Sequence, residues 1–245
     1  PWPTNLNVTH LFNNNFSGIT YKAIHVWSPT LGQYVAICST GVSITDYNTS
    51  DTANSATKIA PFQAFWVKVN ADGNFNVNNS NRSTSNSGLQ VFMKKSPNYV
   101  RLNLFDQDSA FDQIVLYPTD QGKIDLINEG EDAYKLYSMD WAVPTFAIEN
   151  GADLLSIKAF NSEDEIIYAR IRIESFKTNN THNIYLNSSQ LEDDYEVYVL
   201  EVLNGDTIEH NLRERGFSFK TKASLSDPNL PEIYNYTLKI IKKNN

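Results

Sequence analysis

The sequence is poor in cysteine, glycine and basic residues, and it contains no long apolar run. The single cysteine, Cys38, excludes an intrachain disulfide framework, and its place in a strand-like run predicts a buried thiol. Ten glycines in 245 residues leave little room for glycine-rich loops that cradle phosphates. No stretch reaches the roughly 18 apolar residues that a membrane-spanning helix needs, so no membrane insertion is expected. A net charge of −8 argues against nucleic acid or an anionic membrane as a partner.

Catalytic motifs are also missing from the chain. His10, His25, His182 and His210 are scattered, without the spacing of a metal or general-base site. The sequence has no Gly-X-Ser-X-Gly elbow, no P-loop and no dinucleotide-binding glycine pattern. Carboxylates are plentiful, which neither supports nor excludes the paired carboxylates of a glycosidase. We therefore expect a protein that is not an enzyme.

Strand-forming residues dominate what is present. Tyr, Phe, Val, Ile and Thr outweigh Ala, Met and Leu, and short apolar runs are separated by Asn, Asp, Gly and Ser. Asn204-Gly205 is a strong signal for a two-residue hairpin turn. Ile166–Ile173 alternates apolar residues with Arg170 and Arg172, as a strand with one wet face does. The pattern predicts an all-β protein of two antiparallel β-sandwich modules in tandem, jelly-roll or immunoglobulin-like.

The most regular stretch of the sequence is Ile59–Val69. One face of the expected strand carries Phe62, Ala64 and Trp66, and the other carries Phe65, Val67 and Val69. A strand that is apolar on both faces needs cover on both sides. We therefore expect this strand to be central in its sheet, with Trp27 and Trp66 filling the core.

A polar stretch divides the chain into two expected modules. Asn78–Gly88 contains no apolar residue, so residues 1–88 are predicted to form the first sandwich and residues 89–245 the second. Lys123–Leu136 is the part with helical or irregular character. Thr40–Lys58 is a long polar loop, and we expect it to make contacts because binding residues concentrate on loops of a rigid scaffold.

Several motifs along the chain resemble one family of secreted proteins. Its members carry a Pro-aromatic-Pro segment, a hairpin with Val-Trp, an Ile-X-Pro-X-Gln-X-Phe-Phe-Val-Lys strand, an Asp-Ala-X-Lys-Leu segment and a late Leu-Glu-Asp. The matching segments here are Pro1–Thr4, Val26–Trp27, Gln33–Val35, Ile59–Lys68, Glu131–Tyr137 and Leu191–Asp193. The chain thus resembles the β-sandwich modules of cell-surface proteins exported by the type IX secretion system of Bacteroidetes. One departure is Trp66, which stands where the family has a second Phe.

The resemblance implies a location and a role. The chain is expected to be extracellular, secreted or at the cell surface, as a structural spacer or adhesin within a larger protein. Strands preceding Pro1 would be missing, so the first module is expected to be incomplete. Its open edge would be completed by a neighbouring domain of the same polypeptide or by a companion chain. A surface that docks the secretion machinery is a further possibility.

Exposed aromatics suggest a different function, glycan binding. Trp2 and Trp141 fall in expected loops, and aromatic faces suit the C–H faces of sugar rings. A carbohydrate-binding module using these two residues is the alternative to a spacer or adhesin. An accessory domain of a secreted hydrolase is a second alternative.

The densest short acidic spacing is formed by Asp106, Asp108 and Asp112. Oxygen-rich loops can hold Ca²⁺, which takes six to eight oxygen ligands. These aspartates are the candidate calcium ligands, and a solvated turn is the simpler interpretation. No other cofactor is expected.

Overall fold

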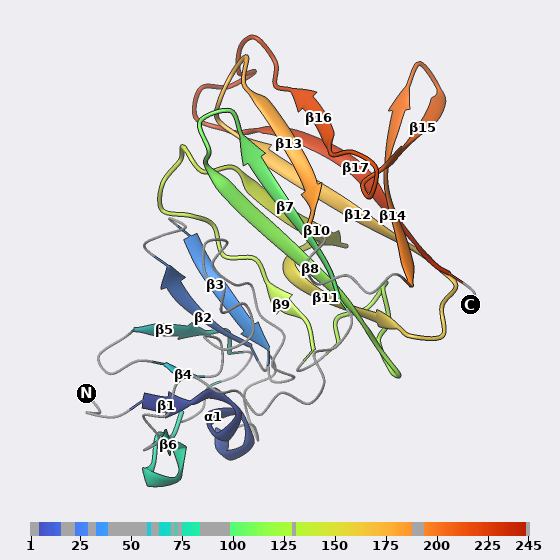
Figure 1. The fold of residues 1–245 in the computed structure, drawn as a ribbon. Coiled ribbons are helices and arrows are strands. Elements are labelled where there is room, and N and C mark those ends of the chain that lie inside the picture. Colours follow the sequence, from blue (N-terminus) through green and yellow to red (C-terminus); the bar gives the residue numbers. More distant parts are fainter. Residues whose placement is uncertain are drawn as a thin grey trace.

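The chain folds as an all-β protein, which confirms the predicted class. The computed structural model describes residues 5–15, 23–28, 33–38, 58–59, 64–69, 72, 75–83, 99–128, 131–187 and 194–243. Within these residues, one short α-helix and one 3-10 turn accompany the strands. The strands form one large sheet and two small ones (Figure 1).

The large sheet contains the strands that follow residue 99. Its strands are β7 (Val100–Asp106), β8 (Phe111–Thr119), β9 (Ala133–Tyr134), β10 (Thr145–Asn150), β11 (Asp153–Asn161), β12 (Ile166–Ser175), β13 (Thr181–Leu186), β14 (Tyr195–Leu203), β15 (Asp206–Asn211), β16 (Phe217–Lys220) and β17 (Glu232–Lys242). They are ordered β15-β14-β17-β12-β10-β11-β8-β7-β13-β16, with β9 beside β11. The pair β11–β8 is parallel, and the other pairs in this sheet are antiparallel.

The large sheet bends over a single core, so strands that are distant in its order meet. Phe217 on β16 lies 4.9 Å from Tyr236 on β17 and 4.7 Å from His210 on β15, measured between ring centroids. The core includes the buried residues Leu102, Leu104, Ile114, Leu116, Phe146, Phe160, Ile171, Ile184, Val197, Leu238 and Ile240. Figure 1 shows β12 and β17 running behind β7, β8 and β13.

Two local predictions for this sheet are confirmed. Along β12, Ile167, Ala169, Ile171 and Ile173 are buried, and the residues between them face outward. Asn204 and Gly205 have φ angles of 54° and 94° and join β14 to β15 as a hairpin. Positive φ at both turn residues matches the twist of the flanking strands, which is why Asn-Gly is favoured there.

The N-terminal part contains two three-stranded sheets. The first has the order β4-β1-β6 and the second β3-β2-β5. The elements are β1 (Asn5–Asn7), α1 (Val8–Asn15), β2 (Ala23–Ser28), β3 (Gln33–Cys38), β4 (Lys58–Ile59), β5 (Phe65–Val67), η2 (Asn79–Asn81) and β6 (Arg82–Ser83). The strands β2 and β3 form a hairpin, as the resemblance at Val26–Trp27 and Gln33–Val35 implies, and Cys38 is buried as expected.

The helix α1 was not predicted from its polar, asparagine-rich sequence. Val8, Leu11 and Phe12 are buried against Ile24, Ile37 and Ile59. Their spacing of three and four residues places them on one face of a helix. Burial of this narrow apolar face against the two small sheets stabilises a segment whose asparagines have little helical preference.

The prediction of a central strand over Ile59–Val69 is wrong. The segment instead contributes to β4 and β5, which belong to different sheets, and among the described strands β5 is an outer strand of its sheet. Trp66 is 59% exposed and therefore does not fill the core. Alternating apolar residues indicate extended backbone, but they do not distinguish one central strand from two short ones. Residues 60–63 lie outside the described part.

The N-terminal hairpin packs directly onto the large sheet. Ala23, Ala36 and Cys38 share a core cluster with Val115 and Tyr117, among others. In Figure 1 the blue strands β2 and β3 lie beside β9. This apolar cluster crosses the predicted division between residues 1–88 and 89–245, which stays a prediction. Residues 84–88 of the predicted boundary lie outside the described part.

His25 makes a polar contact between the hairpin and the large sheet. It is buried in β2, and its Nε2 lies 2.7 Å from the backbone oxygen of Tyr134 in β9. Burial is the main reason that the pKa of His25 falls to about 4, and the nearby charge of Lys135 adds to the effect. A buried imidazole that stays neutral donates one N–H to this carbonyl.

We expect His25 to make stability depend on pH. Between pH 6.5 and 4, His25 binds a proton in the unfolded chain but stays neutral in the folded protein. Because the unfolded state binds more protons, the free energy of unfolding falls as pH falls. At pH 4 the free energy of unfolding is lower by about 3 kcal/mol than at neutral pH because of His25. Gln can donate a similar hydrogen bond without titrating, so urea unfolding of His25→Gln at several pH values should show a smaller loss. Parallel losses in the two proteins would contradict a neutral, buried His25.

Candidate functional site

Trp141 lies at the tip of a tight turn between β9 and β10. The turn is closed by the Asp140 carboxylate, which accepts a hydrogen bond from the backbone N–H of Ala142 at 2.9 Å. The hydroxyl of Ser138 accepts another from the backbone N–H of Asp140 at 3.0 Å. Such side-chain caps are the usual reason that Asp and Ser occur in turns. The indole carried by this turn is 71% exposed.

One face of the Trp141 ring is supported by Phe176. The two rings are stacked, with centroids 5.5 Å apart and planes inclined by 22°. Phe176 directly follows β12 and is fixed by that strand. The indole therefore has one covered face, and its high exposure leaves the other available for a ligand.

A small cavity opens beside Trp141. Its volume is about 170 Å³, and its lining residues are Tyr137, Ser138, Asp140, Trp141, Val143, Thr145, Glu174, Phe176 and Pro231. Pockets for drug-sized ligands are usually larger, at roughly 300–1,000 Å³. The Trp141 pocket, as we call this cavity, therefore suits one ring-sized group rather than a large ligand.

Hydrogen-bonding groups lie at the side of this pocket. Glu174 is 7% exposed, and its carboxylate binds the Arg172 guanidinium at 2.7 Å. The Tyr137 hydroxyl donates a long hydrogen bond of 3.5 Å to the same carboxylate. Burial, followed by the negative charge of Glu174, raises the pKa of Tyr137. The hydroxyl therefore keeps its proton at neutral pH and remains a donor.

This combination of groups has a specific chemical use. An aromatic face beside a carboxylate and a phenol fits a ligand that is apolar on one face and carries hydroxyls at its edge. Sugar rings have this character. The sequence identified Trp141, but it did not identify Tyr137, four residues earlier in the same turn segment, or Glu174 and Phe176, which lie at the end of β12.

The other tryptophans differ from Trp141 in their surroundings. Trp2 lies outside the described residues, so the prediction that it binds a ligand stays a prediction. Trp27 is partly buried and meets Tyr34 edge to face, with centroids 5.2 Å apart. Trp66 is exposed on β5, but it does not line either of the two cavities described here.

Of the three aspartates proposed as calcium ligands, two share one partner and the third lies apart from them. Asp106 and Asp108 both bind Lys177, with O–N distances of 2.5 and 2.8 Å. Asp112 instead points into the interior, where it binds Lys135 at 2.5 Å. Within the described residues, no group of three or more acidic, histidine or cysteine side chains is placed to hold a metal ion. Lysine supplies the positive charge that a cation would have supplied.

Two buried ion pairs hold the Glu131–Tyr137 segment, which is one of the segments that resemble the secreted family, against the large sheet. Lys135 pairs with Asp112, and Lys158 pairs with Asp132 at 2.7 Å. All four side chains have exposed fractions of 3% or less. The segment is therefore pinned at both ends to β8 and β11. Its acidic and basic residues hold the turn in place.

Burial disfavours the charges of the Lys158–Asp132 pair. It lowers the pKa of Lys158 and raises that of Asp132, while the attraction between them opposes both shifts. The Asp132 carboxylate also accepts hydrogen bonds from the backbone N–H groups of Asn128 and Ala159, both at 2.7 Å. Lys158 additionally donates to the backbone oxygen of Leu126. These contacts satisfy a pair that would otherwise be costly to bury.

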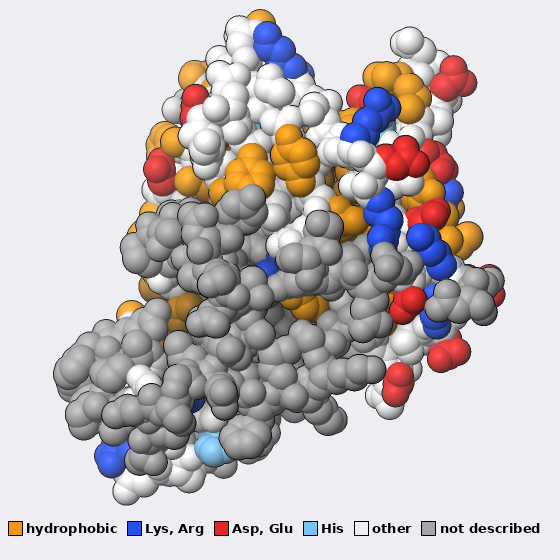
Figure 2. All heavy atoms as spheres, viewed as in Figure 1, with side chains coloured by type: hydrophobic (Ala, Val, Ile, Leu, Met, Phe, Trp, Pro, Cys, Tyr) orange, Lys and Arg blue, Asp and Glu red, His pale blue; other side chains and the backbone are white. Residues whose placement is uncertain are grey.

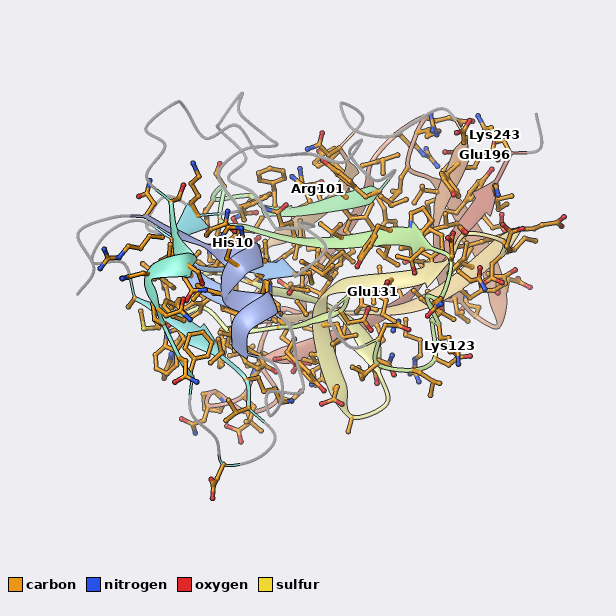
Figure 3. The ribbon with its side chains drawn as sticks, turned by 90° about the horizontal axis from the view of Figure 1, so that it is seen from below. His10, Arg101, Lys123, Glu131, Glu196 and Lys243 are labelled. Carbon is orange, nitrogen blue, oxygen red and sulfur yellow. The ribbon has the colours of Figure 1, made fainter. Side chains whose placement is uncertain are left out.

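A second, larger hollow lies beside this pair. It has a volume of about 620 Å³ and is lined by Asp120, Gln121, Gly122, Lys123, Leu126, Ile127, Asn128, Glu131 and Asn161. Figure 3 shows Lys123 and Glu131 on the same side of the molecule. The hollow has no aromatic platform, so its polar lining gives no indication of a particular ligand.

Comparison with known proteins found no match among family models, curated proteins or solved structures. Among the described helices, none has the length and apolar character to cross a membrane. The function must therefore be argued from the geometry of the site.

Proposed function

We propose that this chain is a non-catalytic β-sandwich module of an extracellular surface protein, and that it binds a sugar ring in the Trp141 pocket. The observation that carries the proposal is the exposed indole of Trp141, which is stacked on Phe176 beside the Glu174 carboxylate. A rigid sheet holds these groups in place before any ligand arrives. Preorganisation of this kind reduces the entropy lost on binding.

The rest of the module acts as a spacer in this proposal. The large sheet has one continuous core, and its turn segments are anchored by buried ion pairs. Such a body resists deformation and holds the pocket at a distance from the cell surface. The motifs that resemble type IX secretion cargo support the extracellular location.

The small N-terminal sheet supports the proposal of a larger assembly. Among the described residues, β3 and β5 are the outer strands of the sheet β3-β2-β5. Outer strands present backbone groups that another strand can pair with. We propose that a neighbouring domain of the same polypeptide or a companion chain completes this sheet.

We expect Trp141→Ala to weaken glycan binding at least tenfold. Covering about 50 Å² of the indole face contributes about 1.3 kcal/mol, which corresponds to a factor of ten in the Kd. The measurement is isothermal titration calorimetry with neutral oligosaccharides from glucan, xylan and mannan. Trp66→Ala is the matched control, because Trp66 is also exposed but lies outside the pocket.

The control distinguishes binding in the pocket from non-specific binding of sugars to any exposed tryptophan. Equal loss in the Trp141→Ala and Trp66→Ala variants would contradict a specific pocket. Unchanged binding in Trp141→Ala would place any sugar site elsewhere. Failure of all three oligosaccharide series to bind the wild-type protein would overturn the proposed ligand.

A further inference from the structure

The Trp141 pocket borders the outer face of the large sheet at Glu174. Glu174, which lines the pocket, points to the same side of β12 as Arg172, Arg170 and Tyr168, because alternate residues of a strand share a face. Tyr168 lies at the far end of this row and is 54% exposed. The row extends over six residue-to-residue steps, or about 20 Å.

A second tyrosine lies across the sheet from Tyr168. In the strand register, Tyr168 of β12 is opposite Lys239 of β17, which in turn is opposite Tyr198 of β14. Two strand spacings place the tyrosines about 10 Å apart on the same face. The ammonium of Lys239 lies 5.6 Å from the centre of the Tyr198 ring. The far end of the row therefore carries two tyrosine rings with a lysine between them.

The charges on this face are balanced by neighbours. Arg172 binds Glu174 at 2.7 Å, Arg170 lies 3.8 Å from Glu149, and Lys239 binds Glu209 at 2.8 Å. Figure 2 shows basic and acidic side chains intermixed on the side where β14 and β17 run. A polyanion would have to displace these carboxylates and would also meet a chain with a net charge of −8. An uncharged ligand neither has to displace the carboxylates nor is repelled by the net negative charge.

We propose that the pocket is one end of an extended site for an uncharged, linear polysaccharide. The chain would lie along β12, with one sugar ring on Trp141 and later rings near Tyr168 and Tyr198. Arg170 and Arg172 lie between these aromatic ends and can donate hydrogen bonds to sugar hydroxyls. This inference rests on the proposed function, because it uses the same pocket.

The test compares neutral oligosaccharides of two and six units from glucan, xylan and mannan. For the series that binds, calorimetry should show at least a tenfold gain in affinity between two and six units. Tyr168→Ala should remove most of this gain and leave the affinity for the two-unit sugar unchanged. Tyr168→Phe keeps the ring and should retain the gain. Trp141→Ala should weaken binding of both lengths.

The outcomes separate the two proposals. If length brings no gain, or if Tyr168→Ala leaves the gain intact, the extended site is refuted and the pocket stands. If Trp141→Ala binds like the wild type, the proposed function itself fails. Tighter binding of a six-unit galacturonate chain would overturn the preference for an uncharged ligand. Binding of a proline-rich peptide with no sugar binding would overturn both proposals.

Discussion

Replacement of Lys158 by Met should lower the free energy of unfolding by about 3–5 kcal/mol. The substitution removes the cation from a pair whose side chains are 0% and 1% exposed, and it leaves the Asp132 carboxylate buried without its partner. An uncompensated buried charge is among the most costly defects in a protein interior. Urea unfolding monitored by circular dichroism measures the effect.

The control for this prediction is Lys239→Met. Lys239 also forms an ion pair, but its partner Glu209 is 45% exposed and solvent screens the interaction. We expect this control to change stability by less than about 1 kcal/mol. Similar small effects in both variants would show that the Lys158–Asp132 pair does not anchor the turn to β11.

Replacement of Phe217 by Ala should cost about 3–5 kcal/mol. Phe217 is buried on β16 and contacts Tyr236 on β17 and His210 on β15. Its ring therefore joins strands from opposite ends of the large sheet, and its removal leaves a cavity where they meet. The loss should appear as a lower urea midpoint with an unchanged dependence on urea concentration.

Tyr168→Ala provides the matched control for this core substitution. Tyr168 is a large aromatic residue on β12, but its side chain faces solvent. Its removal should change stability by no more than about 0.5 kcal/mol. If Phe217→Ala lowered the free energy of unfolding by less than about 1 kcal/mol, the result would contradict the packing of β16 against β17.

Local sequence signals predicted much of the large sheet. The alternation along Ile166–Ile173 reports which residues face the core, and it needs no knowledge of partners. The Asn204-Gly205 turn depends on the backbone preferences of two residues. Both features are confirmed because the physical cause and the sequence pattern lie within the same short segment.

Features that depend on distant partners could not be predicted in this way. β8 and β11 pair in parallel, although most of their neighbours are antiparallel. Lys158 looks like a surface residue in the sequence, and its burial is explained by contacts with Asp132 and the backbone oxygen of Leu126. The alternation in Ile59–Val69 likewise gave no sign that β5 would be an outer strand with Trp66 exposed.

The candidate site likewise combines one residue that the sequence could identify with others that only the fold brings together. Trp141 could be selected because a tryptophan in a polar turn is unusual and suits ligand binding. Phe176 and Glu174 lie more than thirty residues later, and only the fold brings them to the indole. The aspartates considered as calcium ligands show the reverse case, in which residues close in the sequence have different surroundings in the fold. Proximity in sequence suggested a cluster, whereas the strands direct Asp112 inward and Asp106 toward Lys177.

The most direct test of the account follows the indole N–H signals of the four tryptophans by nuclear magnetic resonance during titration with a neutral six-unit oligosaccharide. The signal of Trp141, assigned with a Trp141→Phe variant, should shift progressively and saturate, while that of Trp66 stays in place. A saturating shift at Trp66 with none at Trp141, or no shift at any tryptophan with all three oligosaccharide series, would contradict a sugar site in the Trp141 pocket.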